Sequence, residues 1–328
     1  MDILTDMDRR VYAEELKDRL PDRIFDAHIH LWERSDFPEI WPLEPKNYIN
    51  YFDGHFSLAE WTALLPDLLP GKEVAFNAFG FPDDAVDLDA APACPFHLSL
   101  VSPFDPVEKL AARMERSGSL GVKPYWNFAR KPAAETEIRD MLTPAQLDYL
   151  DRRRAIVTFH IPRPGRFEDP LNQRQMAELC ERWPNIAFIF AHIGRAYYQR
   201  CATKYVDEFV EFPNAYWDTA MINHEGVLKY TFDHFPAERI LFGTDAPISF
   251  IHGKSVEINH QYAYVMPEEY DFGTTLIDRT GKIEYVPFLY EQLRSVLALG
   301  LPPKTLEDFF FNNAHDLYTA VTERMYGK

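Results

Sequence analysis

The sequence contains few cysteines. Cys94, Cys180 and Cys201 are its only three, and they include no C-x-x-C pair. An odd number of scattered cysteines implies no disulfide framework, so the chain lacks the usual signature of a small secreted domain. We therefore expect a reducing, cytoplasmic location.

Positive charge is also scarce. The 34 Lys and Arg residues stand against 51 Asp and Glu residues, which gives a formal net charge of −17. This balance argues against nucleic acid or an anionic membrane surface as a partner. The acids are spread along the chain without a long run, so we expect most of them to form a solubilising surface.

Long hydrophobic runs and linkers are missing as well. The most apolar stretches, such as IAFIFAHIG, are far too short to span a bilayer. The first twenty residues carry acids where a signal peptide needs bases. No repeat, low-complexity tract or Gly/Ser-rich linker divides the 328 residues. We expect a soluble intracellular protein that forms one domain over residues 1–328.

What the sequence does contain is an alternation of short apolar runs and helix-period segments. Most runs, such as AIVTF and IAFIF, are apolar on both faces, which is typical of parallel strands covered by helices. The expected strands are 23–29, 73–79, 95–101, 119–123, 155–161, 186–192, 215–219 and 239–244. Amphipathic helices are expected within 142–153, 172–183 and 225–235. Eight such units favour an α/β fold of the closed (β/α)₈ TIM-barrel type, with an open doubly wound sheet as the alternative.

Polar residues follow these runs at their C-terminal ends. His28 and His30 close the first strand, and strand geometry places them on one face, about 6–7 Å apart along the chain. The fourth, fifth, sixth and eighth strands end in Lys123, His160, His192 and Asp245. Closing the barrel would bring all six side chains to one rim, where the catalytic groups of such barrels lie.

Each of these residues also has an ordinary structural explanation when it is taken alone. H-x-H pairs arise by chance, and a single strand-end histidine is more often hydrogen-bonded than metal-bound. An aspartate after Gly-Thr commonly forms a turn, and a buried lysine can pair with an acid. Six such residues at the same end of one repeating unit together favour a shared metal site.

The motifs DAHIH, GVKPYW, TFH, FAHIG, LFGTDAP and NNAHDLY occur in this order between residues 26 and 318. In this ordered set the sequence resembles the amidohydrolase superfamily of metal-dependent (β/α)₈-barrel enzymes, in particular its amidohydrolase-2 branch. The resemblance implies hydrolysis of an amide, ester or lactone. It equally allows nonoxidative decarboxylation of an aromatic or unsaturated acid.

The resemblance also implies a role for the motif residues. His28, His30 and Asp245 would hold a divalent metal ion, and His160 would complete the set. His192 would contact the substrate or the attacking water. Asp245 and His192 are therefore the expected catalytic residues.

Lys123 matches the position that is carboxylated and bridges two ions in two-metal members of the superfamily. One ion is the favoured expectation here, and an unmodified Lys123 would then bind a substrate carboxylate. Three imidazoles and one carboxylate suit zinc, with manganese or iron as alternatives. Such an ion activates water at neutral pH, and Asp245 would move the proton. Hydrolysis is slightly favoured, because lyase members often replace the first histidine of H-x-H with glutamate.

Long loops are expected after the first and eighth strands, at 31–56 and 247–286. Their many aromatic residues suggest a small organic acid as substrate, and such loops also form subunit contacts, so a homo-oligomer is one expectation. The candidate substrate-binding residues on the rim are Arg163, Arg195 and His224. A closing helix is expected over residues 306–318.

Overall fold

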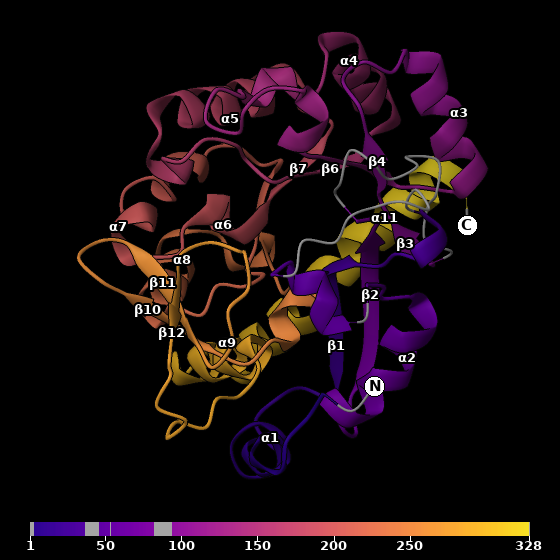
Figure 1. Ribbon diagram of the computed structural model, residues 1–328. Coiled ribbons are helices and arrows are strands. Elements are labelled where there is room, and N and C mark those ends of the chain that lie inside the picture. The colour runs from indigo at the N-terminus through magenta and orange to yellow at the C-terminus, as the bar shows by residue number, and fades with distance from the viewer. Residues whose placement is uncertain (1–2, 37–45, 53, 82–93, 328) are drawn as a thin grey trace.

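The computed structural model describes residues 3–36, 46–52, 54–81 and 94–327. In this part of the chain, short strands form a central ring with helices around its outside (Figure 1). The strands of the ring are β1 (Arg23–His30), β2 (Glu73–Phe79), β3 (Phe96–His97), β4 (Ser99–Val101), β5 (Gly121–Pro124), β6 (Ile156–Phe159), β7 (Ala187–Phe190), β8 (Ala215–Asp218) and β9 (Ile240–Leu241).

The strand pairs of the ring are all parallel, and the last is joined to the first. The backbone N–H of Ala27 in β1 donates to the carbonyl of Phe242 at 2.9 Å, and Asp245 N–H donates to the carbonyl of His28 at 2.8 Å. Because these bonds close the sheet on itself, the predicted (β/α)₈ barrel is confirmed and the open-sheet alternative is wrong.

The expected strands appear where the sequence placed them. The third, 95–101, is present as β3 and β4, and Leu98 between them still donates its N–H to the carbonyl of Ala78 at 3.0 Å. Every residue of β4, β5 and β6 is buried, on the face inside the ring and on the face under the helices. Burial on both faces explains why these runs are apolar throughout rather than alternating.

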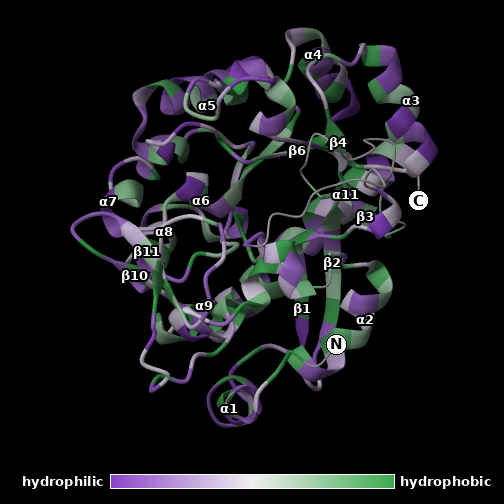
Figure 2. Ribbon diagram, viewed as in Figure 1, coloured by the Kyte–Doolittle hydropathy of each residue, from purple (hydrophilic) through white to green (hydrophobic). Residues whose placement is uncertain are grey.

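The helices lie outside the ring, and Figure 2 shows hydrophobic colour along the strands and mixed faces on the helices. The three predicted amphipathic helices are confirmed as α4, α5 and α8. In α4 the Thr143 hydroxyl accepts the N–H of Gln146 at 3.2 Å and so caps the start of the helix. The helices are α1 (Asp6–Val11), α2 (Leu58–Leu68), α3 (Val107–Ser117), α4 (Pro144–Arg153), α5 (Pro170–Arg182), α6 (Ala191–Arg195), α7 (Gln199–Ala202), α8 (Glu225–His234), α9 (Phe288–Ala298), α10 (Pro303–Glu307) and α11 (Asn313–Tyr326).

The C-terminal helix closes the N-terminal end of the barrel. A short π-helical stretch, Asp308–Asn312, joins α10 to α11. The ring of Tyr318 stacks on Phe25 near the start of β1 at 5.3 Å between centroids, and Phe310 packs against Phe242 at 4.9 Å. The closing helix expected over residues 306–318 is therefore confirmed, and it packs against the barrel.

The long loop after β9 forms a small sheet of its own, which periodicity did not predict. Strand β11 (Tyr262–Met266) pairs with β10 (Lys254–Glu257) antiparallel and with β12 (Thr275–Ile277) parallel. In the other long loop, 37–45 and residue 53 lie outside the described residues. The part that follows contacts the segment between β11 and β12, with Lys46 Nζ 2.7 Å from Glu269 Oε1. The two loops therefore meet over the rim of the barrel.

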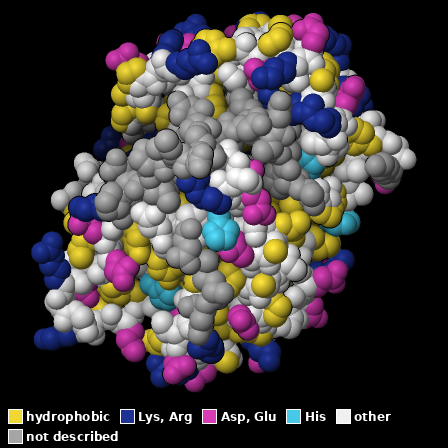
Figure 3. Space-filling model, turned by 45° about the vertical axis from the view of Figure 1, so that its right-hand side comes forward, with side chains coloured by type: hydrophobic (Ala, Val, Ile, Leu, Met, Phe, Trp, Pro, Cys, Tyr) yellow, Lys and Arg dark blue, Asp and Glu magenta, His cyan; other side chains and the backbone are white. Residues whose placement is uncertain are grey.

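The surface mixes charges of both signs. Figure 3 shows acidic, basic and hydrophobic side chains interspersed over the described residues of the face in view. Among the described helices, none combines the length and the apolar character needed to cross a bilayer.

Candidate active site

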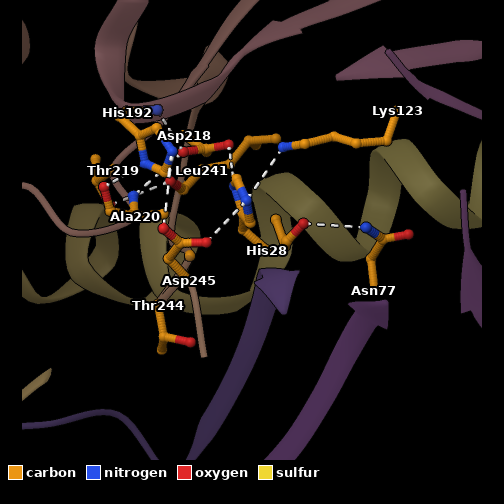
Figure 4. Close-up of polar contacts among 12 residues, drawn as sticks. His28, Asn77, Lys123, His192, Asp218, Thr219, Ala220, Leu241, Thr244 and Asp245 are labelled. Carbon is orange, nitrogen blue, oxygen red and sulfur yellow. Dashed lines mark hydrogen bonds and ion pairs between the residues drawn. The ribbon is translucent and has the colours of Figure 1, made fainter. Parts of the chain in front are cut away.

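Side chains from strands far apart in the sequence meet at the C-terminal end of the ring, around Asp245 (Figure 4). Oδ1 of Asp245 lies 3.3 Å from His28 Nε2 and 3.4 Å from His30 Nε2. Its Oδ2 lies 3.8 Å from His192 Nε2. His28, His192 and Asp245 each offer one donor atom, and these three atoms lie within 4.8 Å of one another. This spacing is compact enough for a single ion.

The three imidazoles around Asp245 present the same nitrogen to it, because each Nδ1 is held by an oxygen. His28 Nδ1 lies 2.9 Å from a carboxylate oxygen of Asp218, His30 Nδ1 lies 2.9 Å from the Gly80 carbonyl, and His192 Nδ1 lies 2.8 Å from the Ala220 carbonyl. These oxygens are acceptors only, so each Nδ1 carries a proton, and each ring turns its Nε2 towards Asp245. This is the arrangement that metal-binding histidines require.

Asp245 is positioned by the first strand and kept ionised by its neighbours. The preceding residue, Thr244, donates its N–H at 2.9 Å and its hydroxyl at 2.6 Å to the buried carboxylate of Asp26 in β1. Burial alone would raise the pKa of Asp245, but His28 and His192 outweigh it and hold the pKa well below its usual range. Asp245 is therefore ionised at neutral pH.

Lys123 lies beneath the imidazoles rather than in open space. Its side chain is fully buried, its Nζ is 3.1 Å from His28 Nε2, and the same atom lies 4.4 Å from the ring centre of Phe79. Burial lowers the pKa of Lys123 to about 8, against the opposing charges of Asp218 and Asp245. An amine with such a pKa is partly neutral near pH 8 and reactive towards electrophiles.

His160 follows β6 and borders the same centre from another side. Its ring stacks on Tyr125 at 5.0 Å, lies 4.6 Å from Trp126 and lies 5.1 Å from the ring of His192. Its Nδ1 is buried and has no hydrogen-bond partner within the described part of the chain. Burial, then the charge of Arg195, lowers the pKa of His160 well below its usual value. A neutral imidazole with an unpaired buried nitrogen is suited to receive a ligand.

The residues after β7 form a strained turn that carries two of the candidate site residues, His192 and Arg195. His192, Ile193 and Gly194 have φ values of 57°, 50° and 62°, and Arg195 continues the run at 64°. The left-handed region costs about 1–2 kcal/mol for each residue that has a Cβ. The turn places the imidazole of His192 beside Asp245, and the Arg195 guanidinium over the ring of Trp126 at 5.3 Å. Strain of this kind is typical of functional sites.

Asp218 is a residue of this site that the sequence analysis missed. It ends β8, it is completely buried, and its carboxylate binds His28 through one oxygen and the backbone of His192 through the other. Burial alone would raise its pKa, but His28 outweighs that effect and holds the pKa of Asp218 at about 2. The signal was present, because AYWDTA is another apolar strand with a polar residue at its C-terminal end.

A pocket of about 510 Å³ opens above the histidines. His30, His160 and Asp245 line its floor. Aromatic side chains from the loops after β1, β2, β5, β7 and β9 form much of its wall, namely Tyr48, Phe81, Tyr125, Trp126, Tyr197, Tyr262, Tyr264 and Phe272. The size suits a small organic molecule, and the wall suits a planar one.

Two arginines line this pocket. Arg166 lies 4.6 Å over the ring of Tyr262, and Arg195 donates to the Ile161 carbonyl at 3.0 Å. In both, Nε is buried without a partner, and neither forms an ion pair with a carboxylate of the described residues. Because no carboxylate of the described residues neutralises these two guanidinium groups, they are suited to bind an anion.

The other two rim candidates lie elsewhere. Arg163 is paired with Asp169 at 2.6 Å, and His224 is paired with Glu257 at 2.9 Å. Neither lines the pocket. Arg166, in the same loop as Arg163, occupies the position that the sequence analysis proposed for its neighbour.

Comparison with known proteins extends these observations. The amidohydrolase family model Amidohydro_2 matches residues 25–319. Curated protein sequences gave no match.

Several solved structures share the fold. An amidohydrolase 2 from Bifidobacterium longum subsp. infantis is 18% identical over 91% of this chain and 99% of that one, with a TM-score of 0.53. A protein assigned as a 2-pyrone-4,6-dicarboxylic acid hydrolase from Pseudomonas putida is 14% identical over 92% and 98%, with a TM-score of 0.53. The 5-carboxyvanillate decarboxylase of Sphingomonas paucimobilis is 9% identical over 91% and 99%, with a TM-score of 0.57.

At these identities the structural likeness shows the fold alone, and it includes both hydrolases and decarboxylases. The family match covers most of the chain, from the H-x-H strand to the C-terminal helix. The chain belongs to the amidohydrolase family of metal-dependent barrel enzymes.

Proposed function

We propose that this protein is a metal-dependent hydrolase that attacks a lactone, ester or amide of a small organic acid. The observation that carries the proposal is the convergence of the Nε2 atoms of His28, His30 and His192 on the ionised carboxylate of Asp245. Each of these rings is held through Nδ1, which leaves Nε2 as the nitrogen turned towards a metal ion.

The residues present fit one divalent ion. His28, His30 and Asp245 would form the core of its ligand set, with His160 as the fourth ligand and its unpaired buried nitrogen as the supporting observation. Neutral imidazoles with one carboxylate suit zinc best, with manganese as the alternative. Because His192 also lies near Asp245, metal content in His160→Ala and His192→Ala decides between these two as the fourth ligand.

When bound, the ion would supply Lewis acidity and lower the pKa of water towards about 7. The chain's own residues would do the rest. Asp245 would accept the proton of the attacking water at a carboxylate oxygen and deliver it to the leaving group. His192 would stabilise negative charge that develops on the substrate carbonyl oxygen.

Lys123 has two candidate roles, and both use its burial against His28. Its amine has a pKa of about 8 and could be carboxylated to bridge a second ion. Unmodified, it would place positive charge beside the reacting centre. The intact mass of the native protein separates these roles, since carboxylation adds one carbon dioxide. A single ion with unmodified Lys123 is the favoured form.

The substrate that we propose is a carboxylate-bearing compound, cyclic or aromatic. The aromatic wall would sandwich a planar ring, and the guanidinium groups of Arg166 and Arg195 would bind the carboxylate. The two guanidinium groups lie on different parts of the wall, because Arg166 lies over the ring of Tyr262 and Arg195 over that of Trp126.

A nonoxidative decarboxylase is the second candidate. It is favoured by the same two arginines, which could hold a departing carboxylate while Asp245 takes a proton from water and delivers it to the carbon left behind. Release of carbon dioxide from a candidate acid would support this reaction, and opening of a lactone without it would support hydrolysis.

The test combines metal content with turnover of a panel of lactones and aromatic acids. We expect about one divalent ion per chain, and loss of turnover in Asp245→Asn with the fold intact. His234→Ala is the control, because His234 is exposed on α8 and bonds only to its own helix through the Tyr230 carbonyl. Full activity in the demetallated protein or in Asp245→Asn would refute the proposal.

The architecture also supports one domain. The ring begins with β1 and is completed only by the segment after β9, so its first and last strands depend on each other. We propose that the described chain unfolds in a single transition, and two separated transitions in calorimetry would contradict this.

A further inference from the structure

The carboxylate of Asp218 binds three groups that come from three parts of the barrel (Figure 4). Its Oδ2 accepts the Nδ1–H of His28, in β1, at 2.9 Å. Its Oδ1 accepts the backbone N–H of His192, after β7, at 2.8 Å and that of Ala220, after β8, at 3.2 Å. Because Asp218 is completely buried, water does not compete for these bonds.

The bond to Ala220 carries the effect of Asp218 further. The carbonyl of Ala220 accepts Nδ1–H of His192 at 2.8 Å. Asp218 therefore orients the ring of His28 directly. It orients His192 in two ways, because it binds the backbone N–H of His192 at the start of the left-handed turn and also binds Ala220, whose carbonyl holds the His192 ring.

We propose that Asp218 is a positioning residue that sets the affinity of the site for its metal ion. It does so by keeping His28 in the tautomer whose Nε2 lone pair faces Asp245. The inference rests on the proposed function, in that it takes the Nε2 atom of His28 as a metal ligand.

The competing explanation is that Asp218 only satisfies two buried backbone N–H groups. Asparagine separates the two explanations, because it keeps one oxygen of the same size and shape. In Asp218→Asn that oxygen would still accept the N–H groups of His192 and Ala220, while the amide nitrogen would face Nδ1 of His28. An amide nitrogen donates only, so His28 would have to accept at Nδ1 and carry its proton on Nε2. The proton would then occupy the position of the metal.

The experiment measures Co²⁺ and Zn²⁺ dissociation constants by chelator competition, together with the visible spectrum of the Co²⁺ protein. We expect Asp218→Asn to bind either ion about 10–100-fold more weakly than the wild type, with an altered Co²⁺ spectrum. Asp8→Asn is the matched control, because Asp8 is also a buried aspartate paired with a histidine ring, His252, at 2.8 Å. We expect it to leave both dissociation constants unchanged.

The outcomes separate the two proposals. Wild-type affinity and spectrum in a folded Asp218→Asn protein would overturn the role of Asp218 and leave the proposed function standing. A wild-type protein that binds neither ion would overturn the proposed function and, with it, this inference.

A crystal structure of the Zn²⁺-loaded wild type tests the role even where the variant does not fold. Zinc on His28 Nε2, with Nδ1 still bonded to Asp218, would support the inference. A His28 that binds zinc through Nδ1, or an Asp218 turned away from it, would overturn it.

Discussion

Gly121 offers a stringent test of the barrel, because it pairs with Ile156 where β5 approaches β6. A Cβ added to Gly121 would lie 1.7 Å from the carbonyl oxygen of Ile156, 2.7 Å from its carbonyl carbon and 2.8 Å from its nitrogen. Real Cβ atoms essentially never come within 3.0 Å of a heavy atom outside their own residue and its two chain neighbours. The strands would therefore have to separate by at least 1.3 Å, the difference between 3.0 and 1.7 Å. All three atoms belong to the backbone, so a change of rotamer cannot relieve the clash.

We expect Gly121→Ala to reduce the free energy of unfolding by about 3 kcal/mol or more, the upper end of the range for overpacked sites. The separation would also weaken the neighbouring hydrogen bond from Ile156 N–H to the Leu120 carbonyl, 3.0 Å long. Urea unfolding with linear extrapolation measures the loss.

Gly118→Ala is the control from the same segment. Gly118 ends α3 with a φ of 75° and has nothing within 4 Å of an added Cβ, so its substitution brings only left-handed strain, about 1–2 kcal/mol. A Gly121→Ala protein as stable as the wild type, or more stable than Gly118→Ala, would refute the close approach of β5 and β6.

Three further predictions concern the pocket, pH and the metal. Arg195→Met should lower kcat/KM for an anionic substrate about 10–100-fold, because charge-assisted hydrogen bonds to the substrate are lost. Arg163→Met should have little effect, because Arg163 lies outside the pocket lining. Equal losses of kcat/KM in the two variants would show that Arg195 does not bind the substrate. Burial lowers the pKa of His97, so the unfolded chain binds its proton more readily, and stability should fall as pH drops below about 6.5. His97→Gln should show a shallower decline in urea unfolding between pH 7.5 and 5.5 in the metal-free state, and an identical slope would contradict this. Adding Zn²⁺ at 100 times its dissociation constant should stabilise the metal-free protein by about 2.7 kcal/mol, read as a rise in Tm, and an unchanged Tm would argue against binding to the folded state.

The barrel and the set of side chains on its rim could be predicted from the amino-acid sequence alone. Runs such as AIVTF and IAFIF are apolar on both faces because each strand lies between the barrel interior and a covering helix, and that burial is imposed by the fold class. Since parallel strands of a closed barrel share one direction, a polar residue at the end of any run must lie on the same rim. This reasoning placed His28, Lys123 and Asp245 near one another without any knowledge of distances.

The groups that hold the imidazoles, and the side chains that line the pocket, could be identified only in the folded chain. Asp218 and His28 are 190 residues apart, and their 2.9 Å contact depends on where β8 and β1 lie in the closed ring. The choice of Arg166 over Arg163 depends on the ion pair of Arg163 with Asp169. Local periodicity carries no information on such contacts, because it reports which face of an element is buried and not which residue lies opposite.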